Sequence, residues 1–430
     1  MVRFTGLDVH KRVVEYCVLD AEGTVATRGR IDLTRESLAR FATTVLTRDD
    51  RGVLEATTNT WAVVRALKPP VAEVVVSNPL RTRAIAEAKV KTDKVDAHVL
   101  AQLLRCDFLP RVWEPDDATQ HLRRLTGRRA SLVGDRTAVK NRIHSVLHQR
   151  LIAAPVTDLF GKAGLAWLCA LDLDPDGRAA VDSELRLLAG VEKEICALDA
   201  TLTKAAWGDP RVKLLMTMPG VDVGVAMTVL AALGDIRRFR DADHAAGYLG
   251  LVPSTSQSAE HCYHGPITKQ GNGHARSMLV QAAQHAASHP GPLGVFFRRL
   301  ARKKNRNVAV VAVARKLVVI AWHMLSKNEP YRYAQPQATQ AKLARLRVKA
   351  TGQRRPGGVP KGAPRPAAYG TGQGTREVPS LGQVCAVEGV PAPQPLAPGE
   401  QRMVRKAAVS RYVERIQTPH RVSRAPQKKE

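Results

Sequence analysis

The first hundred residues alternate short apolar runs with polar turns, a pattern that predicts strands at the start of the chain. Three such runs joined by tight turns predict a meander at residues 3–8, 13–19 and 24–30. Strand-like segments near 53–55 and 71–76 then alternate with helical ones at 35–46, 61–67 and 92–104. This order of elements is that of an RNase H-like domain, so we predict an α/β fold for residues 1–112.

The next segment, residues 113–208, has the periodicity of long helices. Apolar side chains repeat there every seven residues, at Leu125, Leu132, Val139 and Val146. With a second long helix predicted at 181–207, an antiparallel hairpin and a coiled-coil contact between subunits fit equally well. Arg129 and Arg136 lie in the second row of heptad positions on the same helix, where the apolar core of a dimer would exclude them. We therefore predict that both arginines contact nucleic acid.

Beyond the hairpin we predict a mainly helical domain at 209–334 and a tail without fixed structure at 335–430. Residues 337–430 contain 18 Lys+Arg against 5 Asp+Glu, with 11 Pro and 10 Gly. Apolar periodicity is sparse there, apart from a possible short helix at 401–416. A segment of this composition buries too little apolar surface to offset the entropy lost on folding. We therefore expect a disordered basic tail.

The charge of the chain indicates a polyanionic partner. Lys and Arg number 66 against 39 Asp and Glu, which gives a formal charge of +27. Nucleic acid is a better candidate than a membrane surface, because no amphipathic anchor accompanies the charge. The most apolar stretch, 308–324, is interrupted by Arg315 and Lys316, so it is poorly suited to spanning a bilayer.

Two further features lead us to expect a cytoplasmic protein. The N-terminus lacks the apolar core of a secretory signal peptide. The six cysteines lie far apart without a CxxC pair, which argues against a zinc finger and fits a reduced compartment.

Two basic segments in the helical domain are candidate nucleic-acid contacts. One is the run at 298–307; the other surrounds a Gly-Asn-Gly turn that opens a helix. Backbone N–H groups and cations at such a turn can hold phosphates, although a solvated face or a helix cap accounts for the same residues. The candidates are Lys269, Asn272, Arg276, Arg298, Arg302, Lys303 and Lys304.

Four acidic residues in this basic chain lie at the ends of predicted elements. Asp8 ends the first strand and Glu55 ends another, while Asp93 and Asp96 begin a helix with a spacing that puts both on one face. Such a set of carboxylates can bind two hard cations, Mg²⁺ or Mn²⁺, about 4 Å apart for phosphoryl transfer. Taken singly, each residue could equally cap a helix or turn, or pair with an arginine.

Several motifs make the resemblance specific. GLDVHK, LEATTNTW, NPLRTRAIA and KTDKVDAHVLAQLL resemble motifs of the DEDD-type insertion-sequence transposases, the insertion-sequence one-ten family, whose N-terminal domain is RuvC-like. MPGVDVGVAMTVLAALGDIRRF, AAGYLGLVPSTSQSAE and GPITKQGNGHARSMLVQAA resemble the family's C-terminal transposase domain. The resemblance covers about residues 1–333 in the expected order.

The resemblance implies a recombinase that excises and integrates its own element, and a bacterial protein associated with the nucleoid. It assigns Asp8, Glu55, Asp93 and Asp96 as ligands of two Mg²⁺ or Mn²⁺ ions, and Ser258, five residues after the Pro of GLVP, as nucleophile. Family members usually have Gly after this serine where this chain has Ala259, and Ser254 and Ser256 lie close by as alternatives.

The family's partners are DNA, both element ends and target, and a structured guide RNA that pairs with both. The resemblance further implies strand exchange through a covalent 5′-phosphoserine and a Holliday junction. Because the acidic residues and the serine lie far apart in the chain, we expect a homo-oligomer, a dimer or tetramer, with a composite site.

Two other readings stay open at this point. One is a RuvC-like junction-resolving nuclease that uses metal-activated water and does not need Ser258. The other is a non-catalytic nucleic-acid-binding protein whose carboxylates are structural.

Overall fold

A computed structural model of the chain describes residues 1–85, 92–258, 261–353 and 376–422. The residues form two compact units, Met1–Asp116 and Asp117–Glu430, each with its own core. We describe each unit by itself.

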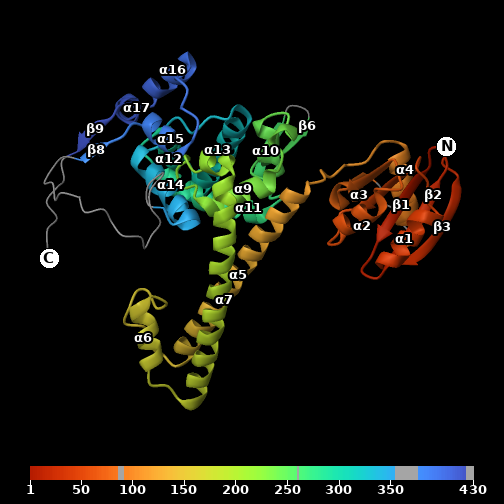
Figure 1. Cartoon of the computed structure of the whole chain (residues 1–430), viewed down its shortest axis with the longest axis horizontal. Helices are drawn as coiled ribbons and strands as arrows, with labels where there is room; N and C mark the ends of the chain where they lie inside the picture. The colour runs from red at the N-terminus through yellow and green to blue at the C-terminus, as the bar shows by residue number, and fades with distance from the viewer. Residues whose placement is uncertain (86–91, 259–260, 354–375, 423–430) are drawn as a thin grey trace. The chain divides into compact units, whose positions relative to one another are not determined.

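The first unit is built on a five-stranded sheet of order β3-β2-β1-β4-β5 (Figure 1). Its strands are β1 (Phe4–Val9), β2 (Val13–Leu19), β3 (Val25–Asp32), β4 (Arg51–Glu55) and β5 (Glu73–Ser77). The first three form the antiparallel meander, and β1, β4 and β5 run parallel to one another. The mixed α/β prediction for this region is confirmed.

Helices cover both faces of this sheet because each central strand is apolar on both sides. Leu7 and Leu54 pack with α1 (Arg35–Thr44) and α2 (Thr60–Leu67) on one face. Val53 packs with α4 (Asp93–Arg105) on the other. A short helix, α3 (Pro79–Ile85), follows β5.

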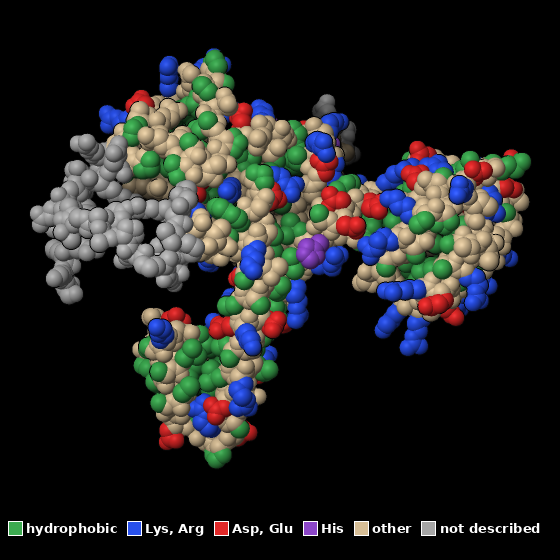
Figure 2. Space-filling view, viewed as in Figure 1, with side chains coloured by type: hydrophobic (Ala, Val, Ile, Leu, Met, Phe, Trp, Pro, Cys, Tyr) green, Lys and Arg blue, Asp and Glu red, His purple; other side chains and the backbone are tan. Residues whose placement is uncertain are grey.

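The second unit begins with an antiparallel hairpin of two long helices, α5 (Asp117–Gln149) and α7 (Pro175–Gly208) (Figure 1). Leu132 and Val139 of the predicted heptad seam are buried, together with Val181 and Leu188 of the second helix. The seam therefore packs on its own chain, as the hairpin alternative predicts. A third helix, α6 (Lys162–Ala170), packs near the hairpin's end, where hydrophobic side chains gather in Figure 2.

The other end of the hairpin joins a helical core, so the prediction of a mostly helical remainder is confirmed. The helices of this core are α8 (Pro210–Leu215), α9 (Val223–Leu233), the 3₁₀ turn Ile236–Arg238, α10 (Ala242–Tyr248), α11 (Gly273–Ala287), α12 (Pro292–Ala301) and α13 (Arg306–Lys327). A two-stranded hairpin, β6 (Pro253–Ser258) and β7 (His261–Ile267), joins α10 to α11. By length and composition α13 could cross a membrane, but its buried face packs in this core.

The prediction of a disordered tail is wrong for the parts of it that the structure describes. Four helices occur there, α14 (Pro336–Thr351), α15 (Leu381–Glu388), α16 (Pro398–Lys406) and α17 (Ser410–Gln417), with two short paired strands, β8 (Arg376–Val378) and β9 (His420–Val422). Each helix contributes one or two apolar side chains to the main helical core. Residues 354–375 and 423–430 of the predicted tail lie outside the described residues.

Polar contacts also join these C-terminal helices to one another and to the core. Arg347 of α14 and Glu388 of α15 form a buried ion pair with an Nη1–Oε1 distance of 2.5 Å. His289, at the end of α11, accepts a hydrogen bond from the Gly291 N–H at Nδ1, and its Nε2 lies 3.3 Å from the Tyr412 hydroxyl of α17. That hydroxyl donates to the backbone carbonyl of Tyr333.

Candidate functional site

The acidic residues of the first unit gather where β1 ends. Side chains alternate along β1, and Gly6 faces α4 so closely that an added β-carbon would lie 2.0 Å from the Ala97 carbonyl oxygen. Asp8, two residues on, therefore points to the same side of the sheet. Because α4 runs antiparallel to β1, its first turn, with Asp93 and Asp96, lies at this end of the strand.

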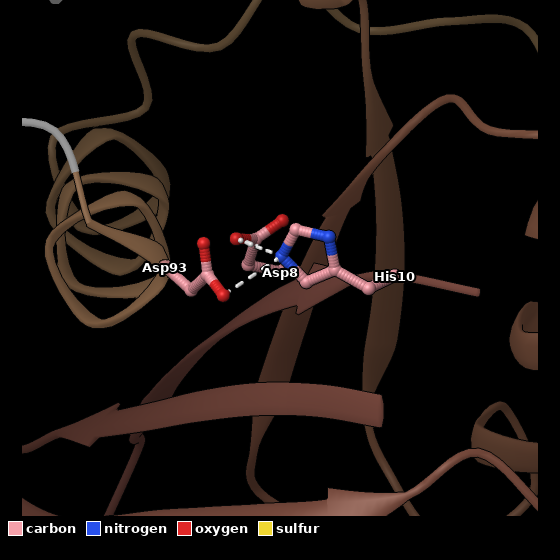
Figure 3. A group of neighbouring side chains, drawn as sticks. All are labelled: Asp8, His10 and Asp93. Carbon is pink, nitrogen blue, oxygen red and sulfur yellow. Dashed lines mark hydrogen bonds and ion pairs between the residues drawn. The ribbon is translucent and has the colours of Figure 1, made fainter. Parts of the chain in front are cut away.

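Asp8 and Asp93 approach each other around a histidine (Figure 3). His10 Nε2 lies 3.0 Å from one oxygen of Asp8 and 3.3 Å from one oxygen of Asp93. The ligand atoms of these three residues all lie within 4.8 Å of one another. The Asp8 side chain is 20% exposed against 54% for Asp93, so the cluster lies at the rim of the sheet.

The environment of Asp8 opposes its ionisation. Partial burial raises the pKa of its carboxyl above the ordinary value, the nearby His10 lowers it, and the charges of Asp93 and Asp96 raise it again. Asp96 lies three residues after Asp93 in the first turn of α4, so it shares that face of the helix. A divalent cation would reverse this balance, because it stabilises the ionised forms of all the carboxylates around it.

Glu55 reaches the same region through the sheet. Strands β1 and β4 are parallel and in register, with Gly6 opposite Val53 and Leu7 opposite Leu54. Glu55 is the next residue of β4, as Asp8 is of β1, and in-register neighbours point to the same face. Glu55 therefore lies beside Asp8 on the face that α4 covers.

His10 is the group that the sequence reasoning did not assign. It follows the last residue of β1, and its N–H donates to the carbonyl of Val13 in the turn to β2. The i, i+2 spacing of Asp8 and His10 across a strand end is the only signal in the sequence. That signal is weak, because such turns commonly carry polar residues.

The candidate serine lies in the second unit. Ser258 is the last residue of β6, and its backbone pairs with His261 at the end of the hairpin. Of the alternatives, Ser254 and Ser256 are exposed on the same strand, and Ser254 donates to the backbone carbonyl of Pro266.

Several predicted nucleic-acid contacts have partners within the chain. Arg129 forms a bidentate ion pair with Asp199 of α7, with a shortest N–O distance of 2.5 Å. Asn272 caps α11 by accepting from the Ala275 N–H, and Arg276 donates to the backbone carbonyls of Leu249 and Gln270. These contacts give the three residues structural roles and leave the prediction of nucleic-acid contact untested.

The remaining candidates lie at the surface. Lys269 is exposed beside the Gly-Asn-Gly turn, and the side chains at the junction of α12 and α13 are exposed as well. The exposed residues of that junction are Arg298, Arg302, Lys303 and Lys304. Arg136 is half-buried on α5. Lys and Arg side chains are also visible along the hairpin in Figure 2.

Two family models match the chain. Residues 5–151 match a DEDD-type transposase model, described as "Transposase", and residues 212–296 match one described as "Transposase IS116/IS110/IS902 family". Together they account for more than half of the chain. The first contains the acidic cluster, that is Asp8, Glu55, Asp93 and Asp96, and the second contains the β6–β7 hairpin with Ser258.

Curated relatives agree with the family models. The chain is 24% identical to the transposase for insertion sequence element IS1111A of Coxiella burnetii, over 77% of this chain and 92% of the relative. It is 28% identical to a probable family 20 transposase of Pseudomonas aeruginosa, over 56% of this chain and 75% of the relative. It is 25% identical to a pilin gene-inverting protein of Moraxella bovis, over 63% of this chain and 76% of the relative.

These matches define a class of enzyme, the DNA transposases and recombinases, which act on DNA. Within that class the chain belongs to the DEDD-type insertion-sequence transposases of the IS110 family.

Proposed function

We propose that the first unit is an RNase H-like, RuvC-like catalytic domain and that Asp8, Glu55, Asp93 and Asp96 hold two Mg²⁺ or Mn²⁺ ions. The observation that carries this proposal is the convergence of β1, β4 and the first turn of α4 at one edge of the sheet. The carboxylate donor set suits hard cations. The raised pKa of Asp8 fits a group whose ionised form needs a cation.

The ions and the residues around them would have separate roles. The ions would supply stabilisation of phosphate charge and of the attacking and leaving oxygens. Asp8 and Glu55, on adjacent strands, would provide the rigid side of the site, and Asp93 and Asp96 the helical side. His10 would have to release its contacts to Asp8 and Asp93 when cations bind, because its Nε2 lies between the two carboxylates.

We further propose Ser258 as the nucleophile. Its Oγ would attack a DNA phosphorus, a 5′-phosphoserine bond would form, and the bond to the 3′-oxygen would break, with the proton passing to that oxygen. A structured guide RNA would select both DNA partners. A homo-oligomer would allow the acidic cluster of one subunit to act with Ser258 of another. The resemblance of the β6–β7 region to the family motif supports this assignment.

The test is covalent capture of DNA. Purified protein, guide RNA, labelled element ends and Mg²⁺ are incubated and then denatured in SDS. We expect an SDS-resistant protein–DNA adduct that requires Mg²⁺ and RNA. It should be absent in Ser258→Ala and in Asp8→Asn, and retained in Glu36→Gln, which removes an exposed carboxylate on α1 of the same unit.

Other outcomes would overturn parts of the proposal. Cleavage without an adduct that survives Ser258→Ala would favour a junction-resolving nuclease. DNA binding without cleavage in any condition would favour a non-catalytic role. An adduct that maps to Ser254 or Ser256 would reject Ser258 and keep the mechanism, and an adduct formed without RNA would reject RNA guidance.

A further inference from the structure

A cavity of about 810 Å³ lies within the second unit, outside the groups considered so far. Helices α12 and α13 and the segment 329–333 form its floor and sides, and α16 contributes a further wall. Apolar side chains dominate the lining: Leu293, Val295, Phe296, Ile320, Met324 and Met403. A volume of this order is typical of sites that accept an organic ligand.

Cations surround this apolar surface. Arg299 and Lys316 flank the Phe296 ring, with Cζ 5.6 Å and Nζ 5.5 Å from the ring centroid. Lys327 and Lys406 also line the cavity. None of these four cations forms an ion pair with another residue in the described parts of the chain.

The carboxylates of the cavity offset only part of this charge. Glu329 and Glu400 are the acidic residues of its lining, and both bind Arg332. With Arg332 counted, the Arg and Lys side chains of the lining outnumber its carboxylates by three, and they surround an aromatic and aliphatic interior. Its ligand should combine a flat apolar group with closely spaced negative charges.

We propose that this cavity binds an unpaired nucleotide of single-stranded DNA. The base would enter between Phe296 and the aliphatic walls, and the adjoining phosphates would contact Arg299, Lys316, Lys327 and Lys406. Aromatic rings that stack on bases beside cations that follow the backbone are the usual basis of single-strand binding. Bases in duplex DNA are stacked and paired, so they could not enter the cavity.

The occupant follows from charge and from the class of enzyme. An acidic peptide would match the charge, but the chain acts on DNA, and strand exchange on DNA exposes unpaired nucleotides. The inference depends on this activity and not on the proposed metals, serine or guide RNA. The α16 wall lies outside both family-matched segments, so this site would belong to the C-terminal part of this chain.

The test is binding and photo-crosslinking of a 12-nucleotide DNA strand that contains one 5-iododeoxyuridine. We expect crosslinks at Phe296 or in peptides of α13 and α16. Phe296→Leu keeps an apolar side chain and removes the ring; it should abolish the Phe296 crosslink and weaken binding by roughly 5- to 150-fold, the range for loss of one stacked base. Thermal unfolding of the variant reports whether it still folds.

Charge is tested by a matched pair of double variants. Arg299→Gln/Lys316→Gln should weaken binding and reduce the slope of log K against log salt by about 1.4, the value for two single-strand phosphate contacts. Arg345→Gln/Lys349→Gln removes two exposed cations of α14 outside the cavity and should change neither.

The following results would overturn the proposal. Equal binding of an abasic strand would show that the cavity does not recognise a base, and crosslinks confined to other regions would place the strand elsewhere. Tighter binding of RNA of the same sequence would assign the site to RNA. Unchanged DNA binding in both cavity variants, with an altered oligomeric state, would assign the cavity to a protein contact.

Discussion

Replacement of Gly6 by alanine should disable the acidic cluster without touching any of its side chains. The new β-carbon would lie 2.0 Å from the Ala97 carbonyl oxygen and 2.7 Å from the Ala101 nitrogen, where side-chain contacts closer than 3.0 Å essentially never occur. Both neighbours are backbone atoms of α4, so no rotamer can relieve the clash. The helix and strand must separate by about 1 Å at this point, the difference between 2.0 and 3.0 Å.

That separation is large for a metal site. Overpacking of this kind costs about 1–3 kcal/mol of stability. Magnesium requires oxygen ligands near 2.0–2.1 Å in almost ideal octahedral geometry, so a shift of about 1 Å in Asp93 and Asp96 relative to Asp8 should break the ligand set. We expect Mg²⁺-dependent DNA cleavage by Gly6→Ala to fall by about 100-fold, the loss typical of such a misplacement.

Gly52→Ala is the matched control. Gly52 lies in β4 of the same sheet, and its added β-carbon would come no closer than 3.9 Å to any neighbour. This variant should retain cleavage and stability. The assays are cleavage of labelled DNA against Mg²⁺ concentration, Mn²⁺ binding by calorimetry, and thermal unfolding. A folded Gly6→Ala protein with wild-type Mn²⁺ affinity and cleavage would show that the first turn of α4 is not part of the metal site.

Three further perturbations have definite expected results. Burial lowers the pKa of His289 to about 4 from 6.5, so the stability that its neutral form contributes is present above pH 6.5 and is lost as the pH falls towards 4. The free energy of unfolding should fall by about 2 kcal/mol between pH 7 and pH 5, and by less in His289→Gln. Arg347→Met leaves Glu388 buried without its partner and should cost about 3–5 kcal/mol in denaturant unfolding, largely recovered in Arg347→Met/Glu388→Leu. If Arg129 contacts RNA, Asp199→Asn should leave filter-binding affinity for guide RNA intact or improved, whereas Arg129→Gln should weaken it; equal losses in both would limit the pair to a structural role.

The elements that were predicted well from the sequence are those whose apolar residues recur at a regular spacing. The strands of the first unit, the helix capped by Thr92 and the two long helices all occur close to their predicted positions. The convergence of Asp8 with Asp93 follows from the same pattern, because strand order and helix position bring strand ends together. The pattern does not give the separation between β1 and α4, which depends on the backbone contact at Gly6.

Apart from the short helix expected at 401–416, where α16 and α17 lie, the C-terminal helices were not predicted, and the reason is physical. Each contributes few apolar side chains to the core, such as Leu343 and Leu346 of α14 or Val413 of α17. Helices α15, α16 and α17 have only 8 or 9 residues, and isolated helices of this length are unstable in water, so local propensity is a weak guide to them. They form because the helical core offers a surface on which those few side chains are buried. The same limit hid the pairing of Arg129 with Asp199, which lies 70 residues away.

The proposed metal ligands and the proposed nucleophile lie on elements that differ in rigidity. Asp8 and Glu55 end strands in the middle of a five-stranded sheet that is covered by helices on both faces, so their positions are fixed before any substrate binds. Ser258 ends a strand of a two-stranded hairpin whose residues are mostly exposed, and such hairpins are only marginally stable alone. If Ser258 is the nucleophile, DNA, RNA or another subunit must therefore hold the hairpin in its reactive position. Cleavage would then await assembly of the complete complex, which protects DNA from attack by the isolated chain.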